Sequence, residues 1–156
     1  MPKAKSLWRT PLYRSLMPFY GWVVMFMGCA VSWSAKKLKI VPLSSAEAET
    51  ACGSIACRDL QFVKFVLGDL FMEKGGIPMS PIPVVTDSEA TYHGSENPGA
   101  TGRTRHYERW LFYLRELAMN MAIKVIHTKT SNMMADVFTK AVDKGTFIRC
   151  RSFLLG

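Results

Sequence analysis

Three carboxylates stand in three separate motifs, each at the end of an element that the sequence predicts. Glu49 lies in the first turns of a helix, Asp87 follows a short strand, and Asp136 follows a strand and a polar loop. Acids at element ends can converge on a divalent cation, which prefers oxygen ligands. Because two-metal hydrolysis of a phosphodiester requires such a cluster, cleavage of nucleic acid is the leading hypothesis from these residues.

Each of these acids also has an ordinary structural explanation. Ser44 and Glu47 form a capping-box signature, and either Glu47 or Glu49 fits the first-turn acid that a helix dipole favours. Asp87 fits a turn residue at a strand end, and Asp136 fits an acid at a helix start. The residues alone therefore leave Glu47 and Glu49 as equal candidates for a metal ligand.

The elements that must position these acids alternate along the chain. Two strand-like runs, 21–27 and 31–42, predict a hairpin connected at 28–30. The later elements are a helix, a strand, two helices, a strand and a helix start, over 44–74, 82–86, 88–93, 103–121, 122–127 and 133–142. This order predicts an α/β fold with a mixed sheet flanked by helices, in which Asp87 lies at a strand carboxyl end, where ligands gather.

Apolar residues at helical spacing predict the buried face of each long helix. For the helix over 44–74 they are Ala48, Cys52, Ile55, Val63, Val66, Leu67 and Leu70. For the helix over 103–121 they are Tyr107, Trp110, Leu111, Leu114 and Leu117, with Arg115 off this face.

The bulk composition indicates one globular domain with a basic surface. The chain has 156 residues, 49% of them hydrophobic, and a net charge of +8. Such a charge favours partners that carry phosphate or an anionic membrane surface. The four cysteines have no metal-binding spacing, so we expect reduced packing thiols in a cytoplasmic or nuclear protein.

Residues 15–35 carry no charge and leave two structures open. The run is long enough for a transmembrane helix, but Pro18, Gly21 and Gly28 interrupt it. Its apolar centre also fits a buried strand that ends at Gly28. We favour the strand and expect no membrane partner.

Five motifs, in order, resemble the ribonuclease H domain of copia-type retrotransposon Pol polyproteins. They are Val-Ser-Trp-Ser-Ala-Lys-Lys at 31–37, Leu-Ser-Ser-Ala-Glu-Ala-Glu at 43–49, Asp-Ser-Glu-Ala at 87–90, Gly-Arg-Thr-Arg-His at 102–106 and Ala-Asp-Val-Phe-Thr-Lys at 135–140. The resemblance implies a basic, poorly ordered lead-in at 1–18, a ribonuclease H-like domain at 19–147 and a C-terminal tail at 148–156.

The resemblance also implies an activity: hydrolysis of the RNA strand of an RNA–DNA hybrid, beside the reverse transcriptase of the same polyprotein. The family holds two Mg²⁺ ions, with Mn²⁺ as a substitute, and uses no small-molecule cofactor. Three of its four ligating and catalytic carboxylates correspond to Glu49, Asp87 and Asp136.

The fourth carboxylate has no counterpart in this sequence. In the family it lies on a first strand ahead of the hairpin, and here no Asp or Glu precedes Glu47. We therefore expect a fold that is incomplete at the N-terminus, as in a truncated or frameshifted element, and an activity that is weak or lost. The alternative is a catalytically dead remnant that binds nucleic acid or serves a structural role.

Basic residues supply candidate contacts to the phosphates of a hybrid. They are Lys36, Lys37, Arg103, Arg105 and His106, with His106 orienting the two arginines. An ordinary solvated basic face explains them equally well. His127 precedes the loop that leads to Asp136, near where some ribonucleases H carry a mobile histidine that aids product release. We favour the alternative, a packed histidine of the strand.

Overall fold

The computed structural model describes residues 17–71, 81–97 and 107–156. Their α/β composition confirms the predicted class. The strands are β1 (Phe19–Phe26), β2 (Cys29–Lys37), β3 (Ile82–Thr86) and β4 (Ile123–His127), and the α-helices are α2 (Ser45–Phe71), α3 (Glu89–Glu96), α4 (Glu108–Met119) and α5 (Lys144–Leu155). Two short 3₁₀ helices, η4 (Thr130–Asn132) and η5 (Met134–Phe138), follow β4.

Strands β1 and β2 form the expected antiparallel hairpin. Phe26 pairs with Cys29 across a two-residue turn, in which Met27 has a φ of 51° and Gly28 a φ of 83°. Two positive φ values match the right-handed twist of the flanking strands. The uncharged run is therefore strand from Phe19 onward, and no helix in the three described ranges is long and apolar enough to cross a membrane.

Strands β3 and β4 pair in parallel, with Ile82 opposite Ile123 and Thr86 opposite His127. The predicted single mixed sheet is wrong for the described residues, because they form two separate two-stranded sheets. Both pairs pack on one core: Ile123 and Val125 of β4 belong to it, and Val24 of the hairpin and Val84 of β3 pack against it. The hairpin and the parallel pair are thus joined by side chains rather than by a backbone ladder.

Helix α2 begins where the capping box predicted, but it buries a different face. Ser44 Oγ accepts from the Glu47 backbone N–H at 3.1 Å, and Glu47 Oε2 accepts from the Leu43 N–H at 2.6 Å. The buried residues are Glu47, Thr50, Ala51, Ser54, Cys57 and Leu60. The expected apolar stripe is wrong, with Val66 and Leu70 exposed. Small and hydroxyl side chains let the first turns pack closely, and that contact sets the orientation of the helix.

Helix α4 buries the predicted face, together with one residue that was expected outside it. Leu111 and Leu114 are almost fully buried, and Leu114 packs with Ile123 in the core. Arg115 is also buried. Its Nε–H donates to the Gly94 carbonyl at 2.7 Å, near the end of α3. A cation at a helix C-terminus is favoured by the helix dipole, and this offsets part of the cost of burial.

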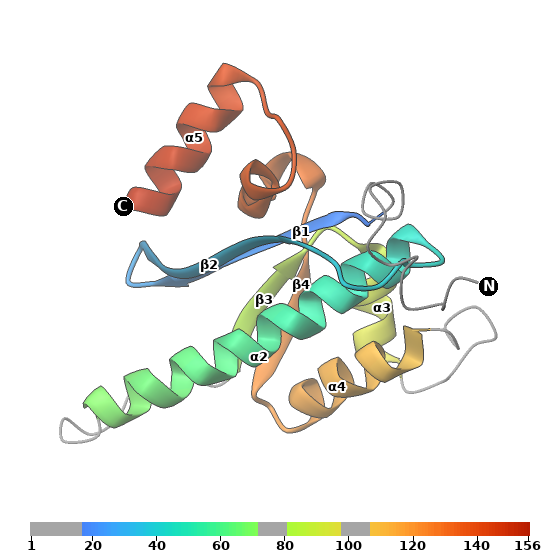
Figure 1. The fold of residues 1–156 in the computed structure, drawn as a ribbon. Helices are drawn as coiled ribbons and strands as arrows, with labels where there is room; N and C mark the ends of the chain where they lie inside the picture. The colour runs from blue at the N-terminus through green and yellow to red at the C-terminus, as the bar shows by residue number, and fades with distance from the viewer. Residues whose placement is uncertain (1–16, 72–80, 98–106) are drawn as a thin grey trace, which may run out of the picture.

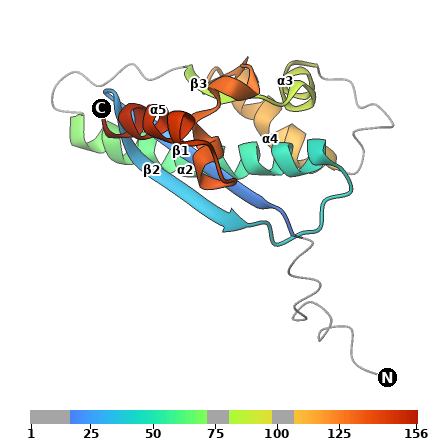
Figure 2. The ribbon, with the colours of Figure 1, turned by 90° about the horizontal axis from the view of Figure 1, so that it is seen from above.

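The hairpin lies between two groups of helices (Figure 1). Helices α2, α3 and α4 lie on one side of it, and α5 lies on the other side against β2. Seen from above, α2 passes beneath the hairpin at an angle to its strands (Figure 2). Where a helix was expected over 133–142, the structure has only the short η5. Helix α5 runs through position 147, where we expected the domain to end and the C-terminal tail to begin.

Candidate functional site

The three acids singled out by sequence approach one another from three different elements. Glu49 stands in the first turns of α2, Asp87 directly follows β3, and Asp136 lies in η5. Asp87 and Asp136 both act electrostatically on Glu49. Glu47 points elsewhere, because its carboxylate caps the start of α2. Between the two candidate glutamates, only Glu49 belongs to this acidic cluster of Glu49, Asp87 and Asp136.

The electrostatics of the cluster raise the pKa of the Glu49 carboxyl above its usual value. Partial burial is the largest cause, followed by repulsion from Asp87 and Asp136, while Lys140 acts in the opposite direction. Glu49 is nevertheless an exposed residue, so the neighbouring protein atoms remove only part of the hydration of its carboxylate. Like charges that raise a pKa in this way are common at functional sites and at sites where a cation is bound.

A chain of buried hydroxyl groups holds Glu49 close to Asp87. Thr50, the neighbour of Glu49, shares a hydrogen bond of 3.0 Å with Thr91 Oγ1, and Thr91 Oγ1 donates to Ser88 Oγ at 3.0 Å. Thr50 and Thr91 are almost completely buried. Ser88 caps α3 and immediately follows Asp87. The hydroxyl chain therefore ties the beginning of α2 to the residue after Asp87.

Gly21 in β1 brings Asp136 to the same place. A Cβ atom on Gly21 would lie 2.8 Å from Phe138 Cβ and 2.9 Å from Thr139 Cγ2, so only glycine lets η5 approach so closely. The Gly21 carbonyl also accepts a hydrogen bond from Cys52 Sγ at 3.6 Å, one turn after Glu49 in α2. One strand residue thus contacts both the element that bears Glu49 and the element that bears Asp136.

Lys140 supplies the positive charge at the cluster. Its Nζ lies 2.7 Å from Asp136 Oδ2, and the Asp136 side chain is only 18% exposed. The hydrogen bond to Asp136 is the main cause that raises the pKa of Lys140, and Asp87 and Glu49 contribute in the same direction. The ammonium group therefore interacts with all three carboxylates.

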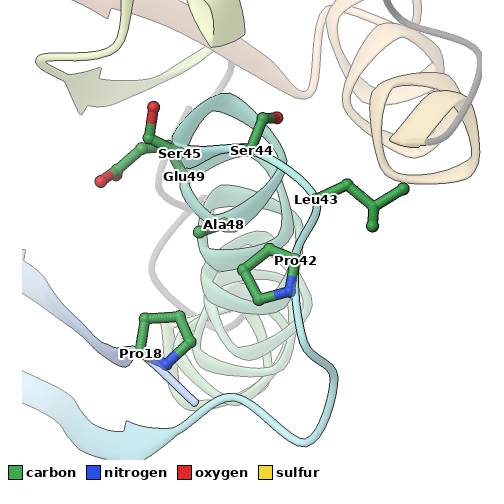
Figure 3. A pocket seen from close by; sticks show the side chains of 7 residues that line it. All are labelled: Pro18, Pro42, Leu43, Ser44, Ser45, Ala48 and Glu49. Atoms are coloured by element: carbon green, nitrogen blue, oxygen red, sulfur yellow. The ribbon is translucent and has the colours of Figure 1, made fainter. Parts of the chain in front are cut away.

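Two shallow depressions adjoin Glu49. One is lined by Pro18, Pro42 and the first turn of α2, and Figure 3 shows the Glu49 and Ser45 side chains side by side at its edge. The other is lined by residues of both acidic elements: Ser45, Ala46, Glu49, Asp87, Ser88 and Ala90. Glu49 and Asp87 therefore share one open depression on the surface.

The carboxylate oxygens of this cluster are suitable ligands for Mg²⁺ or Mn²⁺, but the three side chains do not converge on one position where an ion would bind. Carboxylate oxygens are the ligands that hard divalent cations prefer. Among the described residues, no three His, Cys, Asp or Glu side chains converge closely enough to hold one metal ion. Asp87 and Asp136 act electrostatically on Glu49, and the Lys140 ammonium group offsets part of this negative charge.

The other predicted contact residues fall in different places. Lys36 and Lys37 are exposed at the open end of the hairpin, where Lys37 Nζ lies 5.1 Å from the Phe19 ring centroid. Phe19 adjoins Pro18, which lines the depression beside Glu49. Arg103, Arg105 and His106 lie outside the described residues.

His127 is not the packed histidine that we expected. Its side chain is exposed, because it ends β4 at the rim of the parallel pair. Its Nε2 lies 3.3 Å from the Asp87 carbonyl oxygen, and its ring centroid lies 6.2 Å from that of Tyr92. It therefore stands beside the acidic cluster and faces solvent.

Sequence reasoning missed the residues that assemble the cluster. Lys140 follows Asp136 by four positions, a spacing that places opposite charges together on a helical turn and provides a usable signal. Gly21 was considered only as an interruption of an apolar run. Thr50 and Thr91 gave no signal, because their contact joins residues 41 positions apart.

Comparisons with known proteins agree with the predicted resemblance at a coarse level. The chain is 28% identical over 134 residues to the retrovirus-related Pol polyprotein from transposon TNT 1-94 of Nicotiana tabacum, covering 86% of the chain and 10% of that protein. It is 30% and 28% identical over 128 residues to those from transposons RE2 and RE1 of Arabidopsis thaliana, covering 81% of the chain and 8% of each.

No family model matches the chain, and no solved structure matches it. The matches span most of this chain but about a tenth or less of each curated relative. The chain is therefore a distant homologue of a short stretch of retrotransposon Pol polyproteins.

Proposed function

We propose that this chain is a ribonuclease H-like unit of a copia-type Pol polyprotein whose substrate is the RNA strand of an RNA–DNA hybrid. The observation that carries the proposal is that Glu49 and Asp87 line one depression, with Asp136 near enough to act electrostatically on Glu49. These residues lie in three motifs of the resemblance and come from three elements separated along the chain. An acidic cluster of this kind suits phosphodiester hydrolysis assisted by divalent cations.

The arrangement of the strands supports the same proposal. The family places its first strand between the hairpin and the parallel pair, and this strand bears the fourth acid. Here the hairpin and the parallel pair form separate sheets in the described residues, while sharing one core. No acidic residue precedes Glu47 in the sequence. The acid of that strand is thus the group that the proposal requires another segment to supply.

The missing acid predicts weak or absent cleavage by the chain alone. Loss of a group that merely supports a metal ligand reduces affinity or activity by roughly 10–100-fold, and loss of a ligand itself costs more. We expect activity to appear when an adjoining polyprotein segment supplies a strand with an aspartate. The reverse transcriptase of the same polyprotein is the proposed partner.

A cleavage assay on a labelled RNA–DNA hybrid tests the proposal. The chain is assayed with Mg²⁺ and with Mn²⁺, alone and fused to the preceding polyprotein segment of a relative. We expect cleavage from the fusion and loss of that cleavage in D87N. A fusion that folds and binds hybrid but never cleaves it would contradict the proposal. Robust cleavage by the isolated chain would contradict the predicted impairment.

A second candidate function is a nucleic-acid-binding remnant without catalysis. The observation that favours it is the absence, among the described residues, of three groups that converge on one metal ion. Exposed Lys36 and Lys37 beside the Glu49 depression fit this function. A remnant is expected to bind the hybrid with the same affinity in Mg²⁺ and in a chelator, and its fusion cleaves nothing. A nuclease is expected to cleave the hybrid as a fusion, and only when the cation is present.

A further inference from the structure

The second half of α2 carries a stripe of four exposed residues on one face of the helix. They are Arg58, Phe62, Phe65 and Asp69, and we call them the α2 stripe. Their spacing of four, three and four positions is the spacing at which side chains line up along a single helix face. Phe62 is 68% exposed and Phe65 is 65% exposed. Two aromatic rings therefore face solvent between a cation and an anion.

The described parts of the chain leave this half of α2 uncovered. Leu60 is the last buried residue of the helix, and the final turns of α2 extend beyond the end of α4 (Figure 1). Val66 and Leu70, each one position after a residue of the α2 stripe, are also exposed, at 37% and 69%. Soluble proteins rarely leave several large apolar side chains together in solvent, and such a surface is typical of an interface.

The α2 stripe is symmetric about a point midway between positions 63 and 64. Phe62 and Phe65 lie equally far from that point on its two sides, and so do Arg58 and Asp69. Because the paired positions carry opposite charges, a second copy of the helix running antiparallel places each Arg58 opposite an Asp69 and each Phe62 opposite a Phe65. A parallel copy would instead place like charges together. Among the described residues, neither charge of the stripe takes part in an ion pair.

We propose that the α2 stripe is the contact surface of a two-fold symmetric dimer of this chain, in which two α2 helices pack antiparallel. A two-fold contact joins the same surface on both copies, so the surface must be complementary to itself, as this stripe is. The phenylalanine rings meet at the centre, and an ion pair forms at each end, about 16 Å apart along the helix. The dimer does not depend on the proposed hydrolysis.

The size of the surface sets the expected strength of the dimer. One face of a single helix buries less than the roughly 1,200 Å² at which standard interfaces begin. We therefore expect a dissociation constant on the order of 100 μM, as for weak and transient contacts. The charges at the two ends then contribute mainly to the orientation of the helices and less to the affinity.

Sedimentation equilibrium of the full chain over a concentration series tests the apolar part of the contact. We expect the unmodified chain to form dimers as the concentration rises, and F62S/F65S to remain monomeric. F153S is the matched control, because Phe153 is 48% exposed on α5, on the other side of the hairpin, and we expect it to leave the dimer unchanged. Circular dichroism checks that each variant retains the fold.

Exchange of the two charges tests the antiparallel arrangement. R58E places two acidic groups at each end of the contact and D69R places two basic groups there, so we expect each to weaken the dimer on the order of tenfold. R58E/D69R restores opposite charges at both ends, and we expect it to dimerise like the unmodified chain. An equal mixture of R58E and D69R should likewise form mixed dimers.

Three results would overturn the dimer. The first is an unmodified chain that stays monomeric at millimolar concentration. The second is a folded F62S/F65S variant that still dimerises, because the contact would then lie elsewhere. The third is protection of 58–69 from hydrogen exchange only in the fusion with an adjoining Pol segment, which would assign the α2 stripe to that segment. A folded R58E/D69R variant that dimerises no better than R58E would exclude the antiparallel arrangement.

Discussion

The effect of the acidic cluster on a single residue is a raised pKa of the Glu49 carboxyl. Its pKa is raised chiefly by partial burial and then by Asp87 and Asp136. An acid with a raised pKa in the folded state holds a proton that the unfolded chain has already released. The folded state thus binds more protons in the pH range just above the ordinary carboxyl pKa.

Stability is therefore expected to fall as the pH rises through that range, and the cost persists at neutral pH. E49Q removes the ionisable group, so we expect this variant to melt at a higher temperature than the unmodified chain at pH 7 without metal. Calorimetry from pH 4 to pH 8 measures the effect. D59N, which removes a charge from an exposed position of α2, is the matched control. A lower melting temperature for E49Q at pH 7 would contradict the electrostatic description.

Thr91 is the central residue of the hydroxyl chain between the two acidic elements. T91V replaces the hydroxyl by a methyl group of similar size, and we expect it to cost about 1 kcal/mol of unfolding free energy. It also loosens α2 from α3, so the pKa of Glu49 should fall toward its ordinary value. Denaturant unfolding and NMR titration of Glu49 measure both effects. T91S keeps the hydroxyl and should retain the Glu49 pKa; loss of the shift in T91S would argue against the hydroxyl chain.

Among the elements, the contact of η5 with β1 decides whether Asp136 reaches the cluster. Gly21 permits that contact, because a side chain there would overlap Phe138 and Thr139. We expect G21A to destabilise the chain by about 1–3 kcal/mol, as overpacking does elsewhere. The upward shift of the Glu49 pKa should shrink in parallel, because η5 carries Asp136, one of the causes of that shift.

Gly68 in α2 offers a matched control, since nothing lies within 4 Å of a Cβ atom placed there. G68A should stabilise the chain by roughly 0.5–1 kcal/mol, because alanine is the better helix former. Denaturant unfolding compares the two variants. Equal effects of G21A and G68A would show that the approach of η5 to β1 does not depend on Gly21.

For the whole molecule, the net charge of +8 predicts salt-sensitive binding to an RNA–DNA hybrid. Lys36 and Lys37 are exposed at the open end of the hairpin, near the Glu49 depression. Each lysine that contacts phosphate contributes about 1 to the slope of log affinity against log salt, so K36Q/K37Q should lower that slope by about 2. Fluorescence anisotropy with a labelled hybrid measures it, and an unchanged slope would exclude this end of the hairpin as a binding surface.

Local chemistry made several features predictable from the sequence. The Ser44–Glu47 cap, the turn at Gly28 and the strand over 82–86 depend on residues close together along the chain, and the structure has all of them. The face of α2 was not predictable, because Thr50 and Ser54 are buried by small distant partners rather than by apolar periodicity. Arg115 was likewise assigned to solvent, since its partner carbonyl belongs to another helix.

The sequence by itself determined the three acidic motifs, the order of strands and helices, and the absence of an acid before Glu47. The resemblance already favoured Glu49 over Glu47, whereas only the tertiary structure showed that Asp87 and Asp136 act on Glu49 and that Lys140 offsets their charge. It also decided that the strands form two sheets instead of one. The physical reason is that capping and periodicity act between neighbours in the chain, whereas electrostatic coupling and strand pairing depend on distances that folding sets between remote residues.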